Sequence, residues 1–316
     1  MKTVKNNVLE VNNISLKFDS TIPILNNISF QIKKGQIMGL VGKSGAGKSS
    51  LLNVLAGHLT PNNGEVFLNG EKLKDPRELL VPGYEKIKIV SQDYNLDPHH
   101  TVEENIREAL ISLAEADKNK RVKQLMRLLK LNDISKTKAI HASGGEQQRL
   151  SIARAIALKP DLLLLDEPFS NLDSQLRAKL FDHILKLRAE ENMSIIIVSH
   201  EGQDVLGLSD FIYFLNKGRL SPRKTPLNAY YNLAHLGNSK LFGIVNQLNI
   251  EGKQIRFRPD EYHKAPEIEV IYENSIFLGT HYLNYFLSHT NEQIILSSTE
   301  PLKNLNSIGI NKKIAN

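Results

Sequence analysis

"GKSGAGKSS", at residues 42–50, is the stretch that decides the fold of this chain. It follows the short apolar run "QIMGLV" (36–41), which is typical of a buried strand. It leads into "SSLLNVLAG" (49–57), whose pattern predicts a helix that stops at Gly57. A strand, a glycine-rich loop and a helix in this order are the context in which the pattern G-x-x-x-x-G-K-[ST] binds phosphate. We therefore predict an α/β fold of the P-loop NTPase type.

The residue types of this loop suit a triphosphate. Glycines let the backbone turn its N–H groups toward phosphate oxygens, and the dipole of the following helix favours the same anion. Lys48 is expected to reach the β- and γ-phosphates, Ser49 to place its hydroxyl on Mg²⁺, and Ser50 to lie near the α-phosphate. The alternative, a glycine-rich turn that only closes a strand, is disfavoured by the context. The nucleotide-binding residues predicted here are Gly42, Lys43, Ser44, Gly45, Ala46, Gly47, Lys48, Ser49 and Ser50.

A second buried strand, "LLLLDEP" at residues 162–168, ends in two carboxylates. Open α/β sheets bind their ligands beyond the carboxyl ends of the strands, so these side chains are expected at the phosphate site. Asp166 is predicted to hold Mg²⁺, directly or through water, and Glu167 to polarise the attacking water. An Asp-Glu pair alone is weak evidence. It gains weight from following a phosphate loop.

Two further strands bring a polar side chain to the same edge. "SIIIVSH" (194–200) ends in His200, which is expected to hydrogen-bond the γ-phosphate, although a lone histidine is more often structural. "KIKIVSQ" (86–92) ends in Gln92, which is predicted to sense Mg²⁺ or the attacking water. His99 and His100 lack partners at metal-binding spacing and are interpreted as surface residues.

A second glycine-rich stretch, "HASGGEQQR" at residues 141–149, needs its own explanation. Residues 146–158 show helical periodicity, so this stretch opens a helix and offers another anion-binding terminus. The two glycine-rich stretches fall in different parts of the chain. Two copies facing head to tail bring them onto one ATP more simply than one chain folding back. The residues at this second terminus are Ser143, Gly144, Gly145 and Glu146.

Composition and charge narrow the class of protein. The chain of 316 residues has no cysteine, which excludes disulfides and thiolate metal sites and fits a reducing compartment. No apolar stretch is long enough to span a membrane. The formal net charge is +6, but residues 240–316 carry eight Lys or Arg and eight Asp or Glu. The excess is N-terminal and diffuse, so we expect no nucleic-acid partner.

The predicted pattern of helices and strands divides the chain into two parts. Residues 1–235 combine half-exposed strands, buried strands and a mostly helical part at about 93–158, where "NKRVKQLMRLLKLN" is amphipathic. "DLLLLDE", a helix and "SIIIVSH" form a βαβ unit, hence a parallel sheet. Residues 236–316 show short alternating runs between turn residues, which predict a small separate β domain.

Taken together, these motifs resemble those of the ATP-binding subunit of ATP-binding-cassette transporters. "GKSGAGKS" is similar to the family's Walker A, Gln92 to its Q-loop, "SGGEQ" to its signature and "LLLLDEP" to its Walker B. "SNLD" (170–173) is similar to its D-loop and His200 to its switch histidine. The resemblance covers about residues 8–235. It implies a RecA-like core with an antiparallel β subdomain and a helical subdomain, a dimeric ATP sandwich, and stacking of adenine on Phe18.

The C-terminal part resembles, more loosely, the TOBE-like β domain of bacterial importer ATPases for sugars, polyamines, iron or oxyanions. "FGIVNQL", "FRPDEY" and "SIFLGTHYLNYF" carry this likeness. It implies a peripheral protein on the cytoplasmic face of the membrane, bound to permease subunits and to a second copy of itself or a homologous cassette. Ala142 and Glu146 depart from the usual leucine and glutamine of the signature. Because Ser143 and both glycines remain, ATP contact is still expected.

Other functions remain as alternatives. The first is a soluble cassette ATPase that acts on ribosomes or nucleic acid, although one cassette without sustained heptads disfavours it. The second is a scaffold that holds nucleotide without hydrolysing it, which intact Glu167 and His200 disfavour. Export is a third possibility, which the C-terminal part disfavours. The transported solute is not specified by these residues, since the selective side chains belong to other chains.

Overall fold

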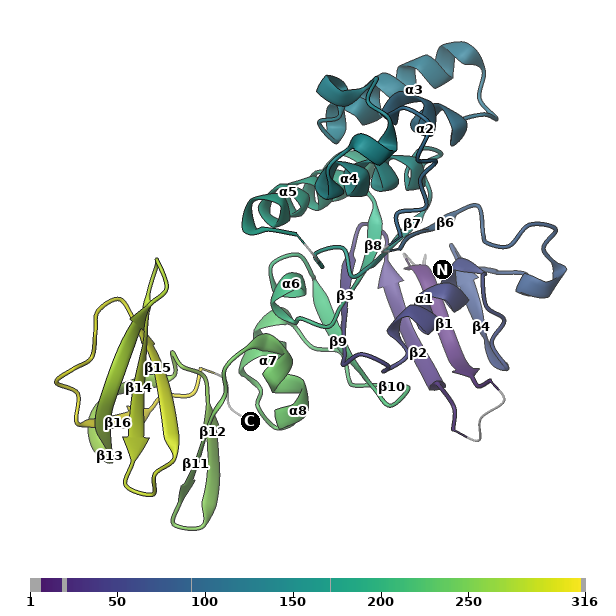
Figure 1. Cartoon of the computed structure of the whole chain (residues 1–316). Coiled ribbons are helices and arrows are strands. Elements are labelled where there is room, and N and C mark those ends of the chain that lie inside the picture. The colour runs from purple at the N-terminus through teal and green to yellow at the C-terminus, as the bar shows by residue number, and fades with distance from the viewer. Residues whose placement is uncertain (1–6, 19–21, 92, 171, 314–316) are drawn as a thin grey trace, which may run out of the picture. The chain divides into compact units, whose positions relative to one another are not determined.

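The computed structural model describes residues 7–18, 22–91, 93–170 and 172–313 (Figure 1). The described chain divides into two compact units, Met1–Arg223 and Lys224–Asn316. Each unit has its own apolar core, and each is described by itself below. The expected architecture, an α/β core that also contains an antiparallel sheet and is followed by a β-rich part, is confirmed.

Two sheets form the framework of the first unit. As predicted, half-exposed alternating segments pair antiparallel, and continuous apolar runs form a mostly parallel sheet. Within the described residues the antiparallel sheet has the order β2-β1-β4-β5 and consists of β1 (Asn7–Leu16), β2 (Leu25–Lys33), β4 (Asn63–Leu68) and β5 (Glu71–Lys72). The described part of the other sheet has the order β10-β9-β3-β8-β7-β6. Its strands are β3 (Ile37–Val41), β6 (Ile87–Val90), β7 (Leu162–Asp166), β8 (Ser194–Ser199), β9 (Phe211–Asn216) and β10 (Arg219–Leu220).

Strands β3, β6, β7 and β8 run parallel, so the residues that follow them gather at one edge of the sheet. Helix α1 (Lys48–Ala56) begins directly after the loop that follows β3. Its Leu51, Leu52 and Leu55 belong to a core cluster that also contains residues of both sheets. The apolar face of α1 therefore fixes the phosphate loop between the two sheets.

The α-helices that follow α1 in the described part of this unit fall into two sets. Helices α5 (Ser174–Glu191) and α6 (Gln203–Leu206) connect strands of the parallel sheet. The helical group, defined as α2, α3 and α4, lies together beside that sheet (Figure 1). Its members are α2 (Val102–Glu108), α3 (Glu115–Leu128) and α4 (Gly144–Ala155), with short 3₁₀ turns η2 (Asn132–Ile134) and η3 (Ala139–His141); η1 (Pro76–Glu78) lies outside the group.

Helix α4 differs slightly from the predicted 146–158. It begins at Gly144 and ends at Ala155, and Ile156 caps it with a non-helical backbone. The helix stops early because the chain must turn before Pro160, and Lys159 adopts a left-handed conformation with φ of 52°. The helix begins at the two glycines that the sequence placed at its start, two residues before position 146.

The second unit is a β structure preceded by short helices. Its small apolar core includes Phe257, Phe286 and Leu296. The described sheets have the orders β11-β12 and β15-β14-β13-β16. The elements are α7 (Pro226–Tyr231), α8 (Leu236–Ser239), η4 (Lys240–Phe242), β11 (Asn246–Ile250), β12 (Lys253–Phe257), β13 (Tyr262–Phe277), β14 (Tyr282–Ser288), β15 (Gln293–Ser298) and β16 (Ser307–Ile310).

The buried Arg258 explains why the structural division falls at Arg223/Lys224 and not at the predicted 235/236. Its guanidinium is fully buried and donates hydrogen bonds to the carbonyls of Tyr230, Ser239 and Ile244. It also lies over the ring of Tyr230, with its Cζ atom 4.2 Å from the ring centroid. These contacts attach α7 and α8 to the β strands that follow them. No pattern in the sequence revealed this attachment.

Replacing Arg258 by alanine is expected to release α7 and α8. The substitution leaves several buried carbonyls without a donor, and each unsatisfied group costs about 1–3 kcal/mol. Amide hydrogen exchange should therefore become at least tenfold faster over residues 226–242. The matched control is Arg256→Ala, because Arg256 also bonds carbonyls of this region, those of Leu233 and Ala234, but from a half-buried position. Equal exchange rates in both variants would contradict this role of Arg258.

Candidate active site

The phosphate loop lies between β3 and α1, and two of its glycines take backbone conformations that other residues avoid. Gly45 has φ of 76° and Gly47 has φ of 100°. A Cβ atom on Gly47 would also lie 2.9 Å from the carbonyl oxygen of Ile24. Within the described chain, the N–H groups of Gly45 and Gly47 donate to no backbone or side-chain acceptor. The loop therefore presents free donors at a helix N-terminus, which is the arrangement that binds phosphate.

Lys48 lies inside this loop. Its side chain is only 5% exposed, and Nζ donates to the carbonyls of Gly42 (2.9 Å) and Lys43 (3.2 Å). The same Nζ atom is 3.6 Å from Oε1 of Glu167. The loop wraps around the ammonium group, and its carbonyls accept hydrogen bonds from it. A triphosphate has only to exchange these carbonyls for its own oxygens.

Asp166 closes β7 beside the first turn of α1. Burial raises the pKa of Asp166 above its ordinary value, and the nearby Ser49 hydroxyl opposes part of that shift. Oxygen Oδ1 of Asp166 is buried and has no hydrogen-bond partner in the described residues. A buried carboxylate oxygen without a donor is costly unless a ligand takes it. The pair formed by Ser49 and Asp166 therefore has the oxygen chemistry that suits Mg²⁺.

Glu167 lies at the centre of the site. Its Oε2 atom is 2.6 Å from Nδ1 of His200, and its Oε1 atom is the one near Lys48. The two contacts join the ends of β7 and β8 to the phosphate loop after β3. His200 is 45% exposed, so its other ring nitrogen is accessible to a ligand. The sequence placed these three side chains at one edge of the sheet, and the structure brings them into contact.

The backbone of Glu167 is strained. Its φ of 50° lies in the left-handed region, which costs a residue with a Cβ atom about 1–2 kcal/mol. Its N–H donates to the carbonyl of Val198 (3.0 Å), and its own carbonyl accepts from the N–H and the hydroxyl of Ser170. Strain of this kind persists only where surrounding contacts hold it, and it is concentrated at functional sites.

A hydrogen-bonded chain holds the turn that carries His200. The Ser199 hydroxyl donates to Oδ2 of Asp204 (2.8 Å) and accepts from the N–H of Glu201 (3.0 Å). Arg177 of α5 donates to Oδ1 of Asp204 (2.5 Å). Burial raises the pKa of Asp204 above its ordinary value, and the bonds from Ser199 and Arg177 oppose that shift. These residues position His200, and sequence analysis did not single them out.

The second predicted anion site, at the start of α4, is open to solvent. Ser143 and Gly144 are exposed, and a Cβ atom on Gly144 would meet nothing within 4 Å. Glu146 accepts the N–H of Ser143 at 2.8 Å, so its carboxylate caps the helix. No hydrogen bond or ion pair of the described chain joins Ser143 or Gly144 to the phosphate loop. The two glycine-rich stretches are thus separate sites within one chain.

Some predicted residues remain apart or undescribed. Phe18, expected to stack on adenine, lies just beyond the end of β1 and is 52% exposed. Gln92 lies outside the described residues, and so does Asn171 of "SNLD". Asp173 caps α5 through the N–H of Leu176 at 2.8 Å. His99 and His100 are exposed, and no group of three or more potential metal ligands occurs in the described part of the chain.

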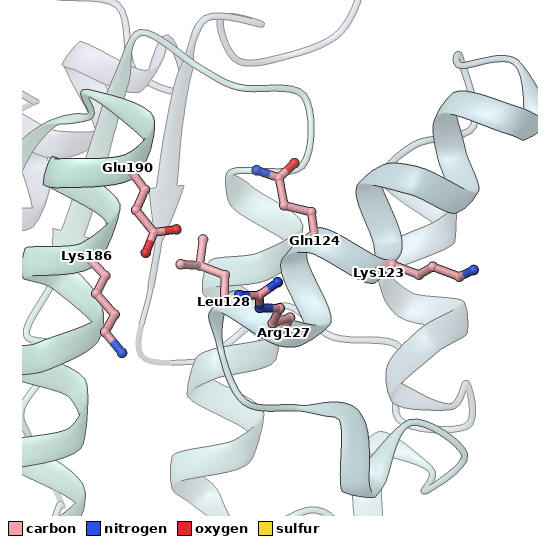
Figure 2. A pocket seen from close by; sticks show the side chains of 6 residues that line it. All are labelled: Lys123, Gln124, Arg127, Leu128, Lys186 and Glu190. Atoms are coloured by element: carbon pink, nitrogen blue, oxygen red, sulfur yellow. The ribbon is translucent and has the colours of Figure 1, made fainter.

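A separate hollow of about 530 Å³ lies between α3 and α5 (Figure 2). Glu190 reaches across from α5 toward Leu128 on α3, whereas Lys123 points away. Beside the hollow, Glu191 accepts hydrogen bonds from Arg121 (2.8 Å) and Gln124 (2.9 Å), which tie α3 to the end of α5. No predicted site residue lines it. Its lining residues are Lys123, Gln124, Arg127, Leu128, Lys186 and Glu190.

Gln148 is a buried side chain of the site region that sequence analysis missed. It is 4% exposed and donates from Nε2 to the carbonyl of Pro168, the residue after Glu167. Its neighbour Gln147 points elsewhere and donates to the carbonyl of Ala139. The run "EQQR" offers no signal that separates the two glutamines, because the partner of Gln148 lies 20 residues further along the chain.

Comparisons with known proteins agree with this geometry. The family described as "ABC transporter" matches residues 25–170. The spermidine/putrescine import ATP-binding protein PotA of Legionella pneumophila is 35% identical over 246 residues. That match covers 77% of this chain and 66% of the relative, so it spans slightly less than two thirds of the relative's length.

Solved structures show the same fold. A dimeric ATP-binding cassette in a post-hydrolysis state, bound to ADP and Pi, is 28% identical with a TM-score of 0.60, and the match covers 69% of this chain and 98% of that one. The cassette cbiO1 of Clostridium perfringens, part of the ABC transporter complex cbiONQ, is 22% identical with a TM-score of 0.65 over 74% of this chain and 93% of that one. The second likeness is one of fold.

Proposed function

We propose that this chain, whose residues 25–170 match the ABC transporter family, binds and hydrolyses ATP and that hydrolysis drives a membrane transporter. The observation that carries the proposal is the contact of Glu167 with both Lys48 and His200 beside the phosphate loop. A loop that binds phosphate, a cation within it and a carboxylate beside that cation are the parts that transfer of a phosphoryl group to water requires.

Mg²⁺ is the cofactor that these residues fit in addition to ATP. The Ser49 hydroxyl and the unpartnered Oδ1 atom of Asp166 offer oxygen ligands next to the expected position of the phosphates. When bound there, Mg²⁺ supplies positive charge that neutralises the phosphate oxygens. Gln92, a further predicted ligand, lies outside the described residues and stays a prediction.

The chain's own residues perform the remaining chemistry. Lys48 leaves the carbonyls of Gly42 and Lys43 and binds the β- and γ-phosphates. Glu167 accepts a proton from water while the water oxygen forms its bond to the γ-phosphorus and the bond from that phosphorus to ADP breaks. His200 holds the carboxylate of Glu167 through Nδ1 and offers its other nitrogen to the γ-phosphate.

A second copy completes the site in this proposal. The start of α4, with Ser143 and Gly144 exposed, offers an anion-binding helix terminus that no hydrogen bond joins to this chain's own phosphate loop. Two copies arranged head to tail place that start against the ATP of the partner. The solved cassette bound to ADP and Pi is dimeric, which supports this arrangement.

Import is the favoured direction of transport. The curated relative is a spermidine/putrescine import protein, so polyamines are the first candidates among the predicted solute classes. From the likeness to an importer subunit, we propose attachment to permease subunits at the cytoplasmic face of the membrane. No helix of the described residues is long and apolar enough to cross a bilayer. The TOBE-like identity of the second unit stays a prediction.

Phosphate release by the purified full-length chain tests the proposal. We expect release that requires both ATP and Mg²⁺ and that rises more steeply than linearly with protein concentration, because the active species is a pair. Binding of ATP without release would instead indicate a nucleotide-holding scaffold. Release that is stimulated by ribosomes or by nucleic acid, and not by co-purified membrane subunits, would favour the soluble alternative.

A further inference from the structure

Gln148 connects the helical group to the loop that carries Glu167. Its buried amide donates to the carbonyl of Pro168, which directly follows Glu167. The same helix, α4, begins with the exposed residues Ser143 and Gly144. One short helix therefore has one end at a predicted phosphate contact and a buried side chain at the catalytic loop. Because an α-helix is stiff over one turn, a shift at its first residues moves Gln148.

The backbone of Glu167 depends on its neighbours for its position. Its left-handed conformation is held by the carbonyl of Val198 on β8 and by Ser170 in the loop after β7. The bond from Gln148 is the contact that reaches the following peptide from the helical group. Losing this bond would free the Pro168 carbonyl and let the Glu167 loop relax from its strained backbone.

Helix α4 is also packed closely against α5 at this point. A Cβ atom on Gly145 would lie 2.9 Å from Cδ2 of Leu176. Gly145 and Gln148 are three residues apart and therefore share one face of α4. The face that carries Gln148 thus touches both the loop after β7 and the start of α5, and α4 cannot shift without disturbing both contacts.

We propose that Gln148 is a positioning residue for Glu167 and transmits the arrival of phosphate at Ser143–Gly145 to this chain's own catalytic carboxylate. This inference rests on the proposed function. In a head-to-tail pair, the phosphate at the start of α4 belongs to the ATP in the partner's loop. Gln148 consequently couples the two ATP sites of the pair. Each copy aligns its Glu167 only after its α4 has bound the ATP held in the loop of the other copy.

The test replaces Gln148 by methionine, which keeps the side-chain length and volume but removes the donor. We expect kcat for phosphate release by the full-length chain to fall at least tenfold. ATP affinity, measured with a fluorescent ATP analogue, should change less than twofold, and the Hill coefficient for ATP should fall toward 1. Gln124→Met is the matched control, because Gln124 also ties the helical group to α5 but contacts Glu191, away from the catalytic loop. It should retain wild-type kcat and Hill coefficient.

A second background separates positioning from a folding defect. When Gln148→Met is added to Glu167→Gln, single-turnover hydrolysis should be no slower than in Glu167→Gln alone, because the carboxylate to be positioned is already absent. Further slowing there, an equal loss of ATP affinity, or a wild-type kcat in Gln148→Met would each overturn the inference. If the unaltered chain releases no phosphate, the proposed function fails and the inference falls with it. Hydrolysis that is unaffected by Gln148→Met rejects the inference alone.

Discussion

Replacing Glu167 by glutamine should reduce phosphate release at least 100-fold while ATP still binds. Removing a general base typically costs about 10²- to 10⁴-fold in rate. The amide keeps the shape of the side chain and its contact with His200, whose Nδ1 lies 2.6 Å from Oε2. The phosphate loop and Lys48 are unaltered, so the affinity for ATP should stay within a few-fold. Initial rates of phosphate release and equilibrium ATP binding measure the two effects.

The same variant should accumulate ATP-bound pairs. The pair is expected to dissociate only after hydrolysis, and the variant no longer hydrolyses the ATP between its two copies. Size-exclusion chromatography should therefore show a dimer with ATP but not with ADP. Glu190→Gln is the control, since Glu190 lines the hollow between α3 and α5 and should leave release and elution unchanged. Undiminished release by Glu167→Gln would reject Glu167 as the base.

Replacing Gly144 by aspartate should strongly reduce hydrolysis while leaving the fold of the single chain unchanged. The position is exposed, and a Cβ atom there meets no neighbour within 4 Å, so the new side chain has room. Asp in the first turn of a helix is favourable for the helix itself. Toward a phosphate at about 4 Å, however, its charge adds a repulsion of about 4 kcal/mol at an effective dielectric constant of 20. We expect turnover to fall at least 100-fold.

Binding assays distinguish the two sites. ATP affinity of the Gly144→Asp variant at low protein concentration should equal that of the unaltered chain, because the phosphate loop is intact. ATP-dependent dimers should be absent in sedimentation experiments. Gly144→Ala, which fills the same space without charge, should hydrolyse ATP within a few-fold of the unaltered rate. Normal turnover by Gly144→Asp, proportional to protein concentration, would show that one copy acts alone.

The sequence predicts the framework of the site because its signals are local. "QIMGLV" and "LLLLDE" are buried strands with polar residues at their carboxyl ends, and a parallel sheet brings such ends together whatever the intervening chain does. The proximity of Lys48, Glu167 and His200 therefore follows from the strand pattern alone. The antiparallel pairing of β1 and β2 follows from alternation in the same way.

The remaining features depend on contacts between distant segments. The left-handed backbone of Glu167 and the bond from Gln148 to Pro168 exist only once α4 packs against the loop after β7. The tie between Arg121 and Glu191 joins residues 70 positions apart. Such contacts leave no periodic pattern in the sequence, and the residue type alone does not reveal whether a glutamine or an arginine is buried or exposed.

The anchoring of α7 and α8 by Arg258 decides where this protein can be trimmed. A fragment that ends after residue 235 would keep α7 but lose the guanidinium that binds the Tyr230 carbonyl, and the ring hydroxyl of Tyr231 would lose Asp260. The C-terminal residues of such a fragment would be partly unfolded and would promote aggregation. A cut before Lys224 avoids this, so crystallisation or spectroscopy of the nucleotide-binding half should start from a polypeptide that stops at Arg223.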